Sequence, residues 1–185
     1  MKNFCFLFLQ GNKTGIYKME ELQFRNADLK DLEKIVEIYN STIPSRMVTA
    51  DTENVSVESR KKWFEEHNPE TRPLWIIENN NHETIGWVSF SSFYGRPAYN
   101  GTVEMSIYLD ESCRGKGFGK KVMKYCIDKA PALGIKTLLG FIFSHNEASL
   151  KLFRHFGFEG WGMLPDVAIL DGIERSLTIL GKRIG

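Results

Sequence analysis

The sequence predicts an α/β chain of the α+β kind, in which a twisted, mostly antiparallel mixed sheet carries helices on both faces. Three observations predict it. A hairpin pattern spans residues 74–91, and a strand with clean alternation follows at residues 102–110. A glycine-rich turn, an amphipathic helix and an almost wholly apolar strand at residues 136–143 come next. Antiparallel strands followed by strand–helix–strand units are typical of a mixed sheet covered on both sides.

Length and charge set the first limits on the kind of protein. The chain has 185 residues, which suits one domain with a real core, and its 42% apolar and 25% charged residues are ordinary for a globular protein. Its formal net charge is +1, which excludes a protein that holds nucleic acid by bulk positive charge. We therefore expect no nucleic-acid partner, and any basic site must be local.

The N-terminus carries a short apolar run at residues 4–9. The run is shorter than the roughly 20 residues of a membrane-spanning helix, and no small-residue cleavage site follows it. We interpret residues 1–18 as an extension outside the core fold, or the product of an upstream start. No repeat or linker divides residues 19–185, which we expect to form a single domain without a membrane partner.

The three cysteines, Cys5, Cys113 and Cys126, form no Cys-x-x-Cys pair and are odd in number. A disulfide framework or a zinc site is therefore not expected, and no other metal site is predicted. Reduced thiols in the cytoplasm are the default expectation. Cys113 precedes a glycine-rich loop, where a small residue before a turn is a better interpretation than a nucleophile.

The first elements are a strand and two helices. Residues 21–25 form a short strand, and Asp28 can cap the helix that follows. The apolar residues of that helix recur at helical spacing: Leu32, Ile35, Val36 and Tyr39. Residues 56–67 form a second helix, with Trp63 and Phe64 near its end.

A hairpin and an aromatic loop follow. Residues 74–78 form a strand, residues 79–82 a polar turn, and residues 84–91 the antiparallel partner. We assign the two large aromatic residues of the second strand, Trp87 and Phe90, to the core. Residues 93–100 are a loop rich in aromatic side chains.

The strand at residues 102–110 alternates cleanly, so its two faces have different compositions. One face carries Val103, Met105, Ile107 and Leu109. The other carries Thr102, Glu104, Ser106 and Tyr108.

The second half of the chain alternates helices and strands. Residues 117–132 form a helix whose apolar residues share one face: Phe118, Val122, Met123, Cys126 and Ile127. The apolar strand at residues 136–143 is expected to be buried on both faces. Asn146 caps a further helix, with Ser149, Leu152, Phe153 and Phe156 on one face, and Gly157 ends it. Residues 158–165 and 174–180 form a final antiparallel pair.

The glycine-rich loop after the alternating strand is the most informative stretch. Gly115, Gly117 and Gly119 let the backbone approach a ligand and turn its N–H groups inward, and the helix start adds its positive dipole end. The basic residues around them are Arg114, Lys116, Lys120 and Lys121. Together they predict a diphosphate site. A dinucleotide-binding fold would place a Gly-x-Gly-x-x-Gly in an early strand–helix unit, whereas this loop comes late.

With these motifs in order, the chain resembles the GNAT N-acetyltransferases, over about residues 24–183. The family's (Arg/Gln)-x-x-Gly-x-(Gly/Ala) loop is matched by Arg114-Gly115-Lys116-Gly117-Phe118-Gly119. Two motifs that come later in the family's sequences are matched by Asn146-Glu147-Ala148-Ser149 and Phe156-Gly157-Phe158. The branch annotated for phosphinothricin or methionine sulfoximine acetylation is the most similar one. Its matching pieces are Ile38-Tyr39-Asn40, Arg96-Pro97-Ala98-Tyr99, Thr102-Val103-Glu104 and Gly162-Met163-Leu164-Pro165.

The resemblance implies where acetyl-CoA lies. The strands at residues 102–110 and 136–143 would splay apart, with acetyl-CoA in the V between them. The backbone of Ile107, Tyr108 and Leu109 would pair with the pantetheine amides as an added strand does. Backbone N–H groups from Gly115 to Lys120 would hold the pyrophosphate. Asn146 would reach the pantetheine, or serve only as a helix cap. Ser149 and Phe153 complete the implied cofactor site.

Acetyl transfer to an amine needs a base, because only the neutral amine attacks, and a donor for the charge that develops on the thioester oxygen. Glu104 is the candidate base, since it lies mid-strand where a structural role favours an apolar or β-branched residue. Its alternative role is a carboxylate on a solvated sheet face. A backbone N–H near Leu109 is the candidate donor.

The acid that protonates the leaving thiolate is where this chain departs from the family. Many members have a tyrosine where this chain has Phe153, which has no proton to give. A thiol of pKa about 8.5 can leave unassisted. Tyr108 and His145 are the candidate substitutes, although a histidine before a helix cap is more often a turn residue.

A small amino-acid acceptor would need a cation for its carboxylate. Arg96 in the aromatic loop, with Tyr99 beside it, is one candidate, and Arg46 is the other. The alternative for each arginine is a solvated surface position.

The sequence therefore predicts an acetyl-CoA-dependent enzyme that acetylates the primary amine of a small molecule such as an amino acid or analogue, without a metal. Two alternatives stay open: a protein or peptide N-acetyltransferase, and a non-catalytic acyl-CoA-binding module. The resemblance also implies a homodimer.

Overall fold

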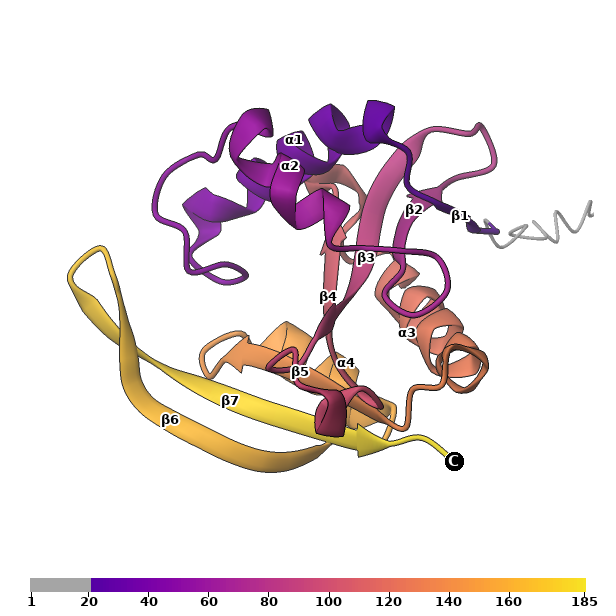
Figure 1. The fold of residues 1–185 in the computed structure, drawn as a ribbon. Helices are drawn as coiled ribbons and strands as arrows, with labels where there is room; N and C mark the ends of the chain where they lie inside the picture. The colour runs from indigo at the N-terminus through magenta and orange to yellow at the C-terminus, as the bar shows by residue number, and fades with distance from the viewer. Residues whose placement is uncertain (1–20) are drawn as a thin grey trace, which may run out of the picture.

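The structure is a computed structural model that describes residues 21–185, so the predicted extension at residues 1–18 lies outside the described residues. Its centre is a seven-stranded sheet with the order β1-β2-β3-β4-β5-β7-β6 (Figure 1). The strands are β1 Gln23–Asn26, β2 Leu74–Glu78, β3 Thr84–Ser92, β4 Thr102–Leu109, β5 Thr137–Phe143, β6 Glu159–Leu170 and β7 Ile173–Arg183. Every pair in this sheet is antiparallel except β4 with β5. The predicted mixed, mostly antiparallel sheet is confirmed.

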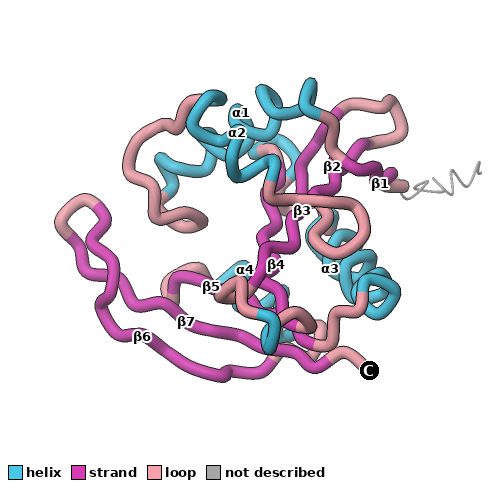
Figure 2. Tube along the Cα trace, viewed as in Figure 1, coloured by secondary structure: helices cyan, strands magenta, loops and turns pink. Residues whose placement is uncertain are grey.

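Four α-helices of the described chain cover the two faces of the sheet (Figure 2): α1 Leu32–Thr42, α2 Val57–Glu65, α3 Phe118–Lys129 and α4 Glu147–His155. The strand β2 shows the two layers, because its side chains alternate between them. Trp75 and Ile77 join the core cluster that contains the buried residues of α3 and α4. Leu74 and Ile76 join the cluster beneath α1 and α2. Within residues 21–185, no helix is both long and apolar enough to cross a bilayer.

The predicted order of elements is correct, and the differences lie at their ends. The helix predicted at residues 56–67 is α2, capped by Ser56 and two residues shorter at its end. The helix predicted at residues 117–132 ends at Lys129, because Pro131 cannot continue it and residues 130–133 form a 3₁₀ turn instead. The final strands are longer than predicted. The register of β6 shifts between Leu164 and Ala168, which lets the hairpin continue past Pro165.

The parallel pairing between β4 and β5 is short. It joins Thr102 with Thr137, Val103 with Leu138 and Glu104 with Leu139, and then stops. Both strands continue beyond this point, β4 to Leu109 and β5 to Phe143. The edge of β4 that faces β5 therefore has no strand partner after Glu104 among the described residues, which is the predicted splay.

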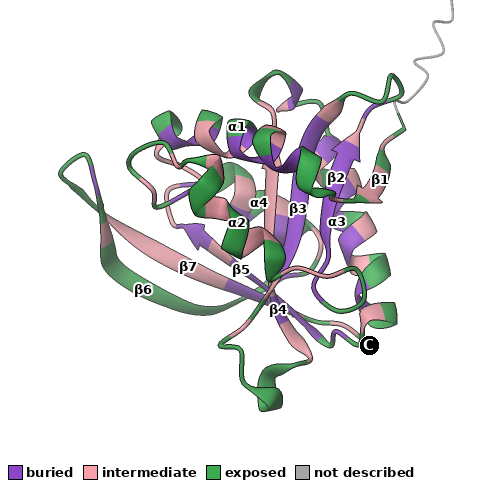
Figure 3. Cartoon of the chain, turned by 45° about the horizontal axis from the view of Figure 1, so that its top comes forward, coloured by how far each residue is buried: buried purple, intermediate pink, exposed green. Residues whose placement is uncertain are grey.

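The alternation predicted for β4 is confirmed. Val103 and Met105 are 0% and 3% exposed in the core cluster on the α3 side, and Ile107 and Leu109 pack against the same cluster. Glu104, Ser106 and Tyr108 point to the opposite face, toward α1 and α2. Figure 3 shows the buried centre of the sheet and the contrasting exposed arm of β6. The strand β4 thus presents a polar row beneath the two N-terminal helices.

Candidate active site

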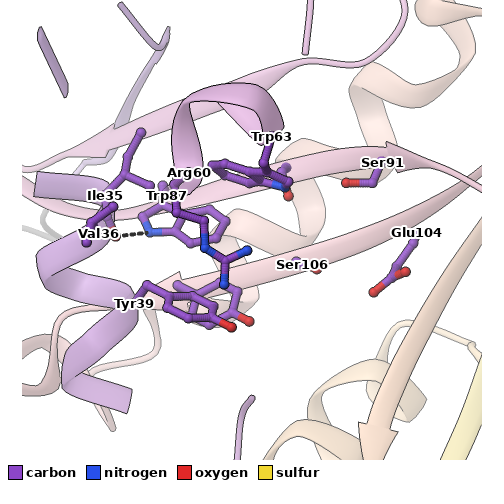
Figure 4. A pocket seen from close by; sticks show the side chains of 11 residues that line it. Ile35, Val36, Tyr39, Arg60, Trp63, Trp87, Ser91, Glu104 and Ser106 are labelled. Carbon is purple, nitrogen blue, oxygen red and sulfur yellow. Dashed lines mark hydrogen bonds between the residues drawn. The ribbon is translucent and has the colours of Figure 1, made fainter. Parts of the chain in front are cut away.

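A cavity of about 240 Å³ lies between the helices α1 and α2 and the polar face of β3 and β4. The helices contribute Ile35, Val36, Tyr39, Arg60 and Trp63, and the strands contribute Trp87, Ser89, Ser91, Glu104, Ser106 and Tyr108. Figure 4 shows Arg60 between Trp63 and Tyr39, with Glu104 further along the strand. The volume suits a ligand of amino-acid size.

Stacked aromatic rings form one wall of the cavity. The rings of Trp87 and Tyr108 stack at 4.3 Å with an interplanar angle of 17°, and the ring of Tyr39 lies 5.2 Å from that of Tyr108. Trp63 meets Trp87 edge-on at 5.5 Å. The indole Nε1 of Trp87 donates a hydrogen bond to the Ile35 carbonyl at 3.1 Å, which joins β3 to α1. The wall is therefore held in place by packing and by a buried hydrogen bond.

Glu104 projects into this cavity at the last position where β4 pairs with β5. Among the described residues, no donor forms a hydrogen bond or an ion pair with its carboxylate. Burial raises the pKa of Glu104, because the charged form loses hydration without gaining a partner. Such a carboxylate is a stronger base than a solvated one and remains available to a ligand.

Tyr108 lies on the same face of β4, four residues along the strand and so roughly 13 Å away by strand geometry. Burial is the main cause that raises the pKa of Tyr108, so its hydroxyl stays protonated near neutral pH. The group can donate a hydrogen bond in the cavity. Its proton is held too tightly for it to be a strong acid.

Arg60 is a cavity residue that the sequence analysis missed. Its guanidinium lies 4.5 Å from the centre of the Tyr39 ring, and its Nη2 donates to Asp51 at 2.7 Å. The Tyr39 hydroxyl also donates to Asp51, at 2.5 Å, and contacts the Thr49 hydroxyl. The signal was present in the sequence. Arg60 precedes Trp63 and Phe64 by three and four positions, which puts a cation on the apolar face of α2.

Three residues predicted for catalysis, acceptor capture or cofactor binding lie outside the cavity lining and hold a loop in place. Arg46 donates to Asp171 at the tip of the β6–β7 hairpin, at 2.9 Å, and to the Thr52 carbonyl, at 2.9 Å. The Nε2 of His145 lies 2.8 Å from the Arg46 carbonyl oxygen. The Asn146 amide donates to the Met47 carbonyl at 2.9 Å. These contacts fix the loop after α1 against the end of β5.

Arg96 and Tyr99 are exposed in the aromatic loop between β3 and β4. The Tyr99 ring meets that of Phe93 edge-on at 5.5 Å. Neither residue lines the cavity within this chain. Their predicted contact with an acceptor therefore stays a prediction.

The glycine-rich loop has the geometry of an anion cradle. Gly115 and Gly117 have φ values of +73° and +82°, and no atom lies within 4 Å of where a Cβ would stand at either. Helix α3 begins directly after Gly117, so its first N–H groups lack a side-chain cap. The Nη2 atom of Arg114 is buried without a hydrogen-bond partner, while its Nε donates to the Leu109 carbonyl at 3.4 Å. A buried guanidinium nitrogen without a partner, beside open N–H groups, fits a phosphate ligand.

The remaining predicted cofactor residues divide between this loop and the core. Lys116 and Phe118 line a second cavity beside the loop, whereas Gly119 faces α4 and a Cβ there would lie 3.1 Å from Leu152. The Asn146 side chain accepts from the Ser149 N–H at 3.1 Å, so it caps α4 as predicted. Phe153 is buried, and its ring covers Gly140 so closely that a Cβ there would lie 2.3 Å from it.

The described cysteines pack in the interior. Cys113 and Cys126 are both buried and free, which leaves Cys113 in the role of a small packed residue. Cys5 lies outside the described residues. Residues 21–185 contain no group of three or more His, Cys, Asp or Glu side chains arranged to hold a metal ion.

Comparisons with known proteins agree on one family. A model described as the acetyltransferase (GNAT) family matches residues 32–158. The YwnH protein of Bacillus subtilis, provisionally named a phosphinothricin acetyltransferase, is 52% identical over 163 residues, which is 88% of this chain and 99% of that protein. An L-methionine sulfoximine/L-methionine sulfone acetyltransferase of Pseudomonas aeruginosa is 30% identical, over 84% and 91% of the two chains. A crystal structure of a phosphinothricin acetyltransferase from Sinorhizobium meliloti with acetyl-CoA superposes with a TM-score of 0.82, at 27% identity, over 89% of each chain.

Proposed function

This chain belongs to the GNAT family of acetyltransferases, and we propose that its acceptor is the primary amine of an amino acid or a close analogue. It is an N-acetyltransferase whose co-substrate is acetyl-CoA. The names of its relatives support phosphinothricin and methionine sulfoximine or sulfone as trial acceptors. The observation that carries the proposal is a small cavity that joins an unpartnered carboxylate, Glu104, to a cation, Arg60. We also propose that the enzyme works in the cytoplasm, which the two buried, free thiols of residues 21–185 support.

In the proposed reaction, Glu104 removes a proton from the acceptor's ammonium, directly or through one water. The neutral amine then attacks the thioester carbon. The backbone N–H near Leu109 is the proposed donor to the carbonyl oxygen, because it lies on the edge of β4 that β5 leaves unpaired. Acetyl-CoA supplies the activated acyl group, and its thiolate can leave unassisted at a thiol pKa of about 8.5. Tyr108, whose hydroxyl stays protonated, could donate a hydrogen bond to the departing thiolate, whereas the Nε2 of His145 already contacts the Arg46 carbonyl.

For acetyl-CoA, we propose the two surfaces that fit its parts. The free edge of β4 at Ile107, Tyr108 and Leu109 would pair with the pantetheine amides, with Asn146, Ser149 and Phe153 on the α4 side. The N–H groups of residues 115–120 and the unpartnered Nη2 of Arg114 would hold the pyrophosphate.

For the acceptor's carboxylate, we propose Arg60. Its guanidinium lines the cavity. Among the described residues its hydrogen bond is the one from Nη2 to Asp51, so the other N–H groups are available to a carboxylate. Arg46 is engaged with Asp171, and Arg96 lies outside this chain's cavity lining. We therefore propose Arg60 in place of Arg96 and Arg46, the two candidates that the sequence offered.

The experiment that tests the function compares acceptor classes by thiol release from acetyl-CoA. The first class is free L-amino acids with phosphinothricin and methionine sulfone, the second is the same amines without the carboxylate, and the third is short peptides. We expect turnover with members of the first class and at least tenfold lower kcat/KM for the second. Turnover with peptides alone would show that the acceptor is a peptide and not a free amino acid. If no class of acceptor releases thiol, the chain only binds acyl-CoA.

We propose that two copies of the chain form a homodimer by contact between their outer strands β6. A charged side chain introduced on this strand should dissociate the dimer. The strand is an edge of the sheet, and its large apolar side chains Met163, Val167 and Ile169 are 62%, 56% and 66% exposed. Exposed apolar edges are normally covered in native proteins. The change Ile169→Glu should convert the dimer to a monomer at micromolar concentration, as measured by light scattering after size exclusion. The control is Leu29→Glu, at a residue 62% exposed before α1. A monomeric wild type would refute the dimer.

A further inference from the structure

Acetylation of an ammonium leaves one proton to dispose of. The nitrogen loses two protons, the departing thiolate takes up one of them, and the other must reach solvent. In the proposed reaction the first proton goes to Glu104. Glu104 is half-buried and lines the cavity at the end away from Tyr108. A neighbouring group that takes the proton onward from Glu104 would return its carboxylate to the basic form for the next cycle.

Ser91 stands next to Glu104 on the neighbouring strand. The two residues are directly opposite each other in the antiparallel register of β3 and β4, and both line the cavity. Opposite residues on one face of an antiparallel pair have their Cβ atoms about 5 Å apart. No direct hydrogen bond joins the two side chains among the described residues, so a proton would pass between them through one water or after the Glu104 side chain turns. Figure 4 shows Ser91 and Glu104 at the same end of the cavity.

His67 lies on the other side of Ser91, just after the end of α2. Its Nε2 is 3.5 Å from the Ser91 hydroxyl oxygen, and its Nδ1 is 2.8 Å from the Trp63 carbonyl oxygen. A carbonyl oxygen can only accept, so Nδ1 carries the hydrogen and Nε2 is the bare, basic nitrogen. The ring is half-buried, so part of it is open to solvent. The Ser91 hydroxyl can therefore donate to a basic nitrogen.

We propose that Ser91 and His67 relay the acceptor's proton from Glu104 to solvent, an inference that rests on the proposed function. Glu104 takes the proton from the ammonium and becomes a neutral acid. The Ser91 oxygen accepts this proton while its own hydroxyl proton passes to His67 Nε2. The imidazolium keeps its Nδ1 proton on the Trp63 carbonyl and gives its Nε2 proton to water at the exposed part of the ring, so the starting tautomer and the Glu104 carboxylate are both restored. The second proton of the nitrogen leaves with the thiolate as a thiol, so the step balances.

The other polar groups around the cavity are poor receivers for this proton. Arg60 is a guanidinium and has no lone pair to accept with. Tyr39 and Tyr108 are neutral hydroxyls whose pKa values burial raises, so neither is a ready carrier. Asp51 is held by Arg60 and by the Tyr39 hydroxyl. Outside the cavity, Glu66 is the charged group nearest in sequence to His67 and favours its imidazolium. Burial holds the pKa of His67 below its ordinary value, so the ring does not trap the proton.

The test uses the whole chain with His67→Asn, which can keep a donor toward the Trp63 carbonyl but removes Nε2. We expect kcat to fall about tenfold at pH 7. The deficit should shrink as the pH rises, because the acceptor's amine then loses its proton in solution. Ser91→Ala should show the same deficit, and the double variant should be no worse than either single one, since both break one path. His82→Asn is the matched control, at an exposed histidine in the β2–β3 turn.

The possible results distinguish a failure of the proton relay from a failure of the proposed function. A deficit of equal size at every pH, or activity of His67→Asn and Ser91→Ala equal to that of His82→Asn, overturns the relay. If these two variants are fully active while Glu104→Gln is not, the relay alone fails and the proposed function stands. A wild-type chain that releases no thiol with any amine overturns both. Thermal unfolding of each variant shows whether the chain is folded, and Ser91→Ala keeps the test decisive if His67→Asn unfolds.

Discussion

Glu104→Gln should lower kcat by about 10²- to 10⁴-fold and leave the affinity for acetyl-CoA unchanged. This is the range that a positioned general base contributes, and glutamine keeps the shape of the side chain without its basicity. The carboxylate is the unpartnered, half-buried acid of the cavity, at the point where β4 and β5 separate. The affinity should survive because the proposed pyrophosphate cradle, at residues 114–120, lies beyond the other end of β4.

Thiol release gives kcat, and calorimetry with coenzyme A gives the affinity. Glu33→Gln is the control, at an exposed glutamate of α1. Equal turnover by Glu104→Gln and wild type would move the base elsewhere in the cavity.

The raised pKa of Glu104 should make stability and activity respond to pH in opposite directions. Burial raises the pKa of Glu104 in the folded chain above its unfolded value of about 4.3. The folded state therefore binds this proton more tightly than the unfolded state, so ionised Glu104 costs stability at neutral pH, and that cost is relieved as the pH falls through the raised pKa. Glu104→Gln should accordingly unfold at an equal or higher temperature at pH 7. Activity should be lost over the same acid range, because the base becomes protonated. A lower unfolding temperature for the variant at pH 7 would contradict this account.

Arg60→Met should raise KM for carboxylate-bearing acceptors by roughly 10- to 100-fold, the effect of losing a charge-assisted pair in a cavity. Methionine keeps much of the apolar stem that packs on Tyr39, so the cavity wall should persist. Amines without a carboxylate should show little change in KM, which separates recognition from folding.

Lys62→Met serves as the control, at an exposed lysine two positions along α2. An equal rise in KM for acceptors with and without a carboxylate would argue that Arg60 shapes the cavity rather than recognises the carboxylate.

The sequence predicted those parts of the site that lie on one element. The alternation of β4 placed Glu104, Ser106 and Tyr108 on one face, because the side chains of a strand point alternately to its two sides. The loop glycines were predicted for the same reason, since the positive φ angles at Gly115 and Gly117 depend on local backbone geometry. Local patterns of this kind need no knowledge of what packs against them.

The parts that could not be predicted depend on contacts between distant segments. His145 and the Arg46 carbonyl are 99 residues apart, and Arg46 and Asp171 are 125 apart, so no local pattern shows that these groups meet. The nearness of Ser91 to His67 depends on how α2 lies across β3. Arg60 carried a local signal, but its relevance appears only when α2 covers the polar face of β4.

The central claim is that the cavity under α1 and α2 holds an amino-acid acceptor whose amine faces Glu104. A crystal structure of Glu104→Gln with coenzyme A and L-methionine sulfone tests it most directly. The account predicts the amine nitrogen within about 2.6–3.2 Å of the side chain at position 104, directly or through one water, and the carboxylate on Arg60. An acceptor bound outside this cavity, with its amine remote from position 104, would contradict it.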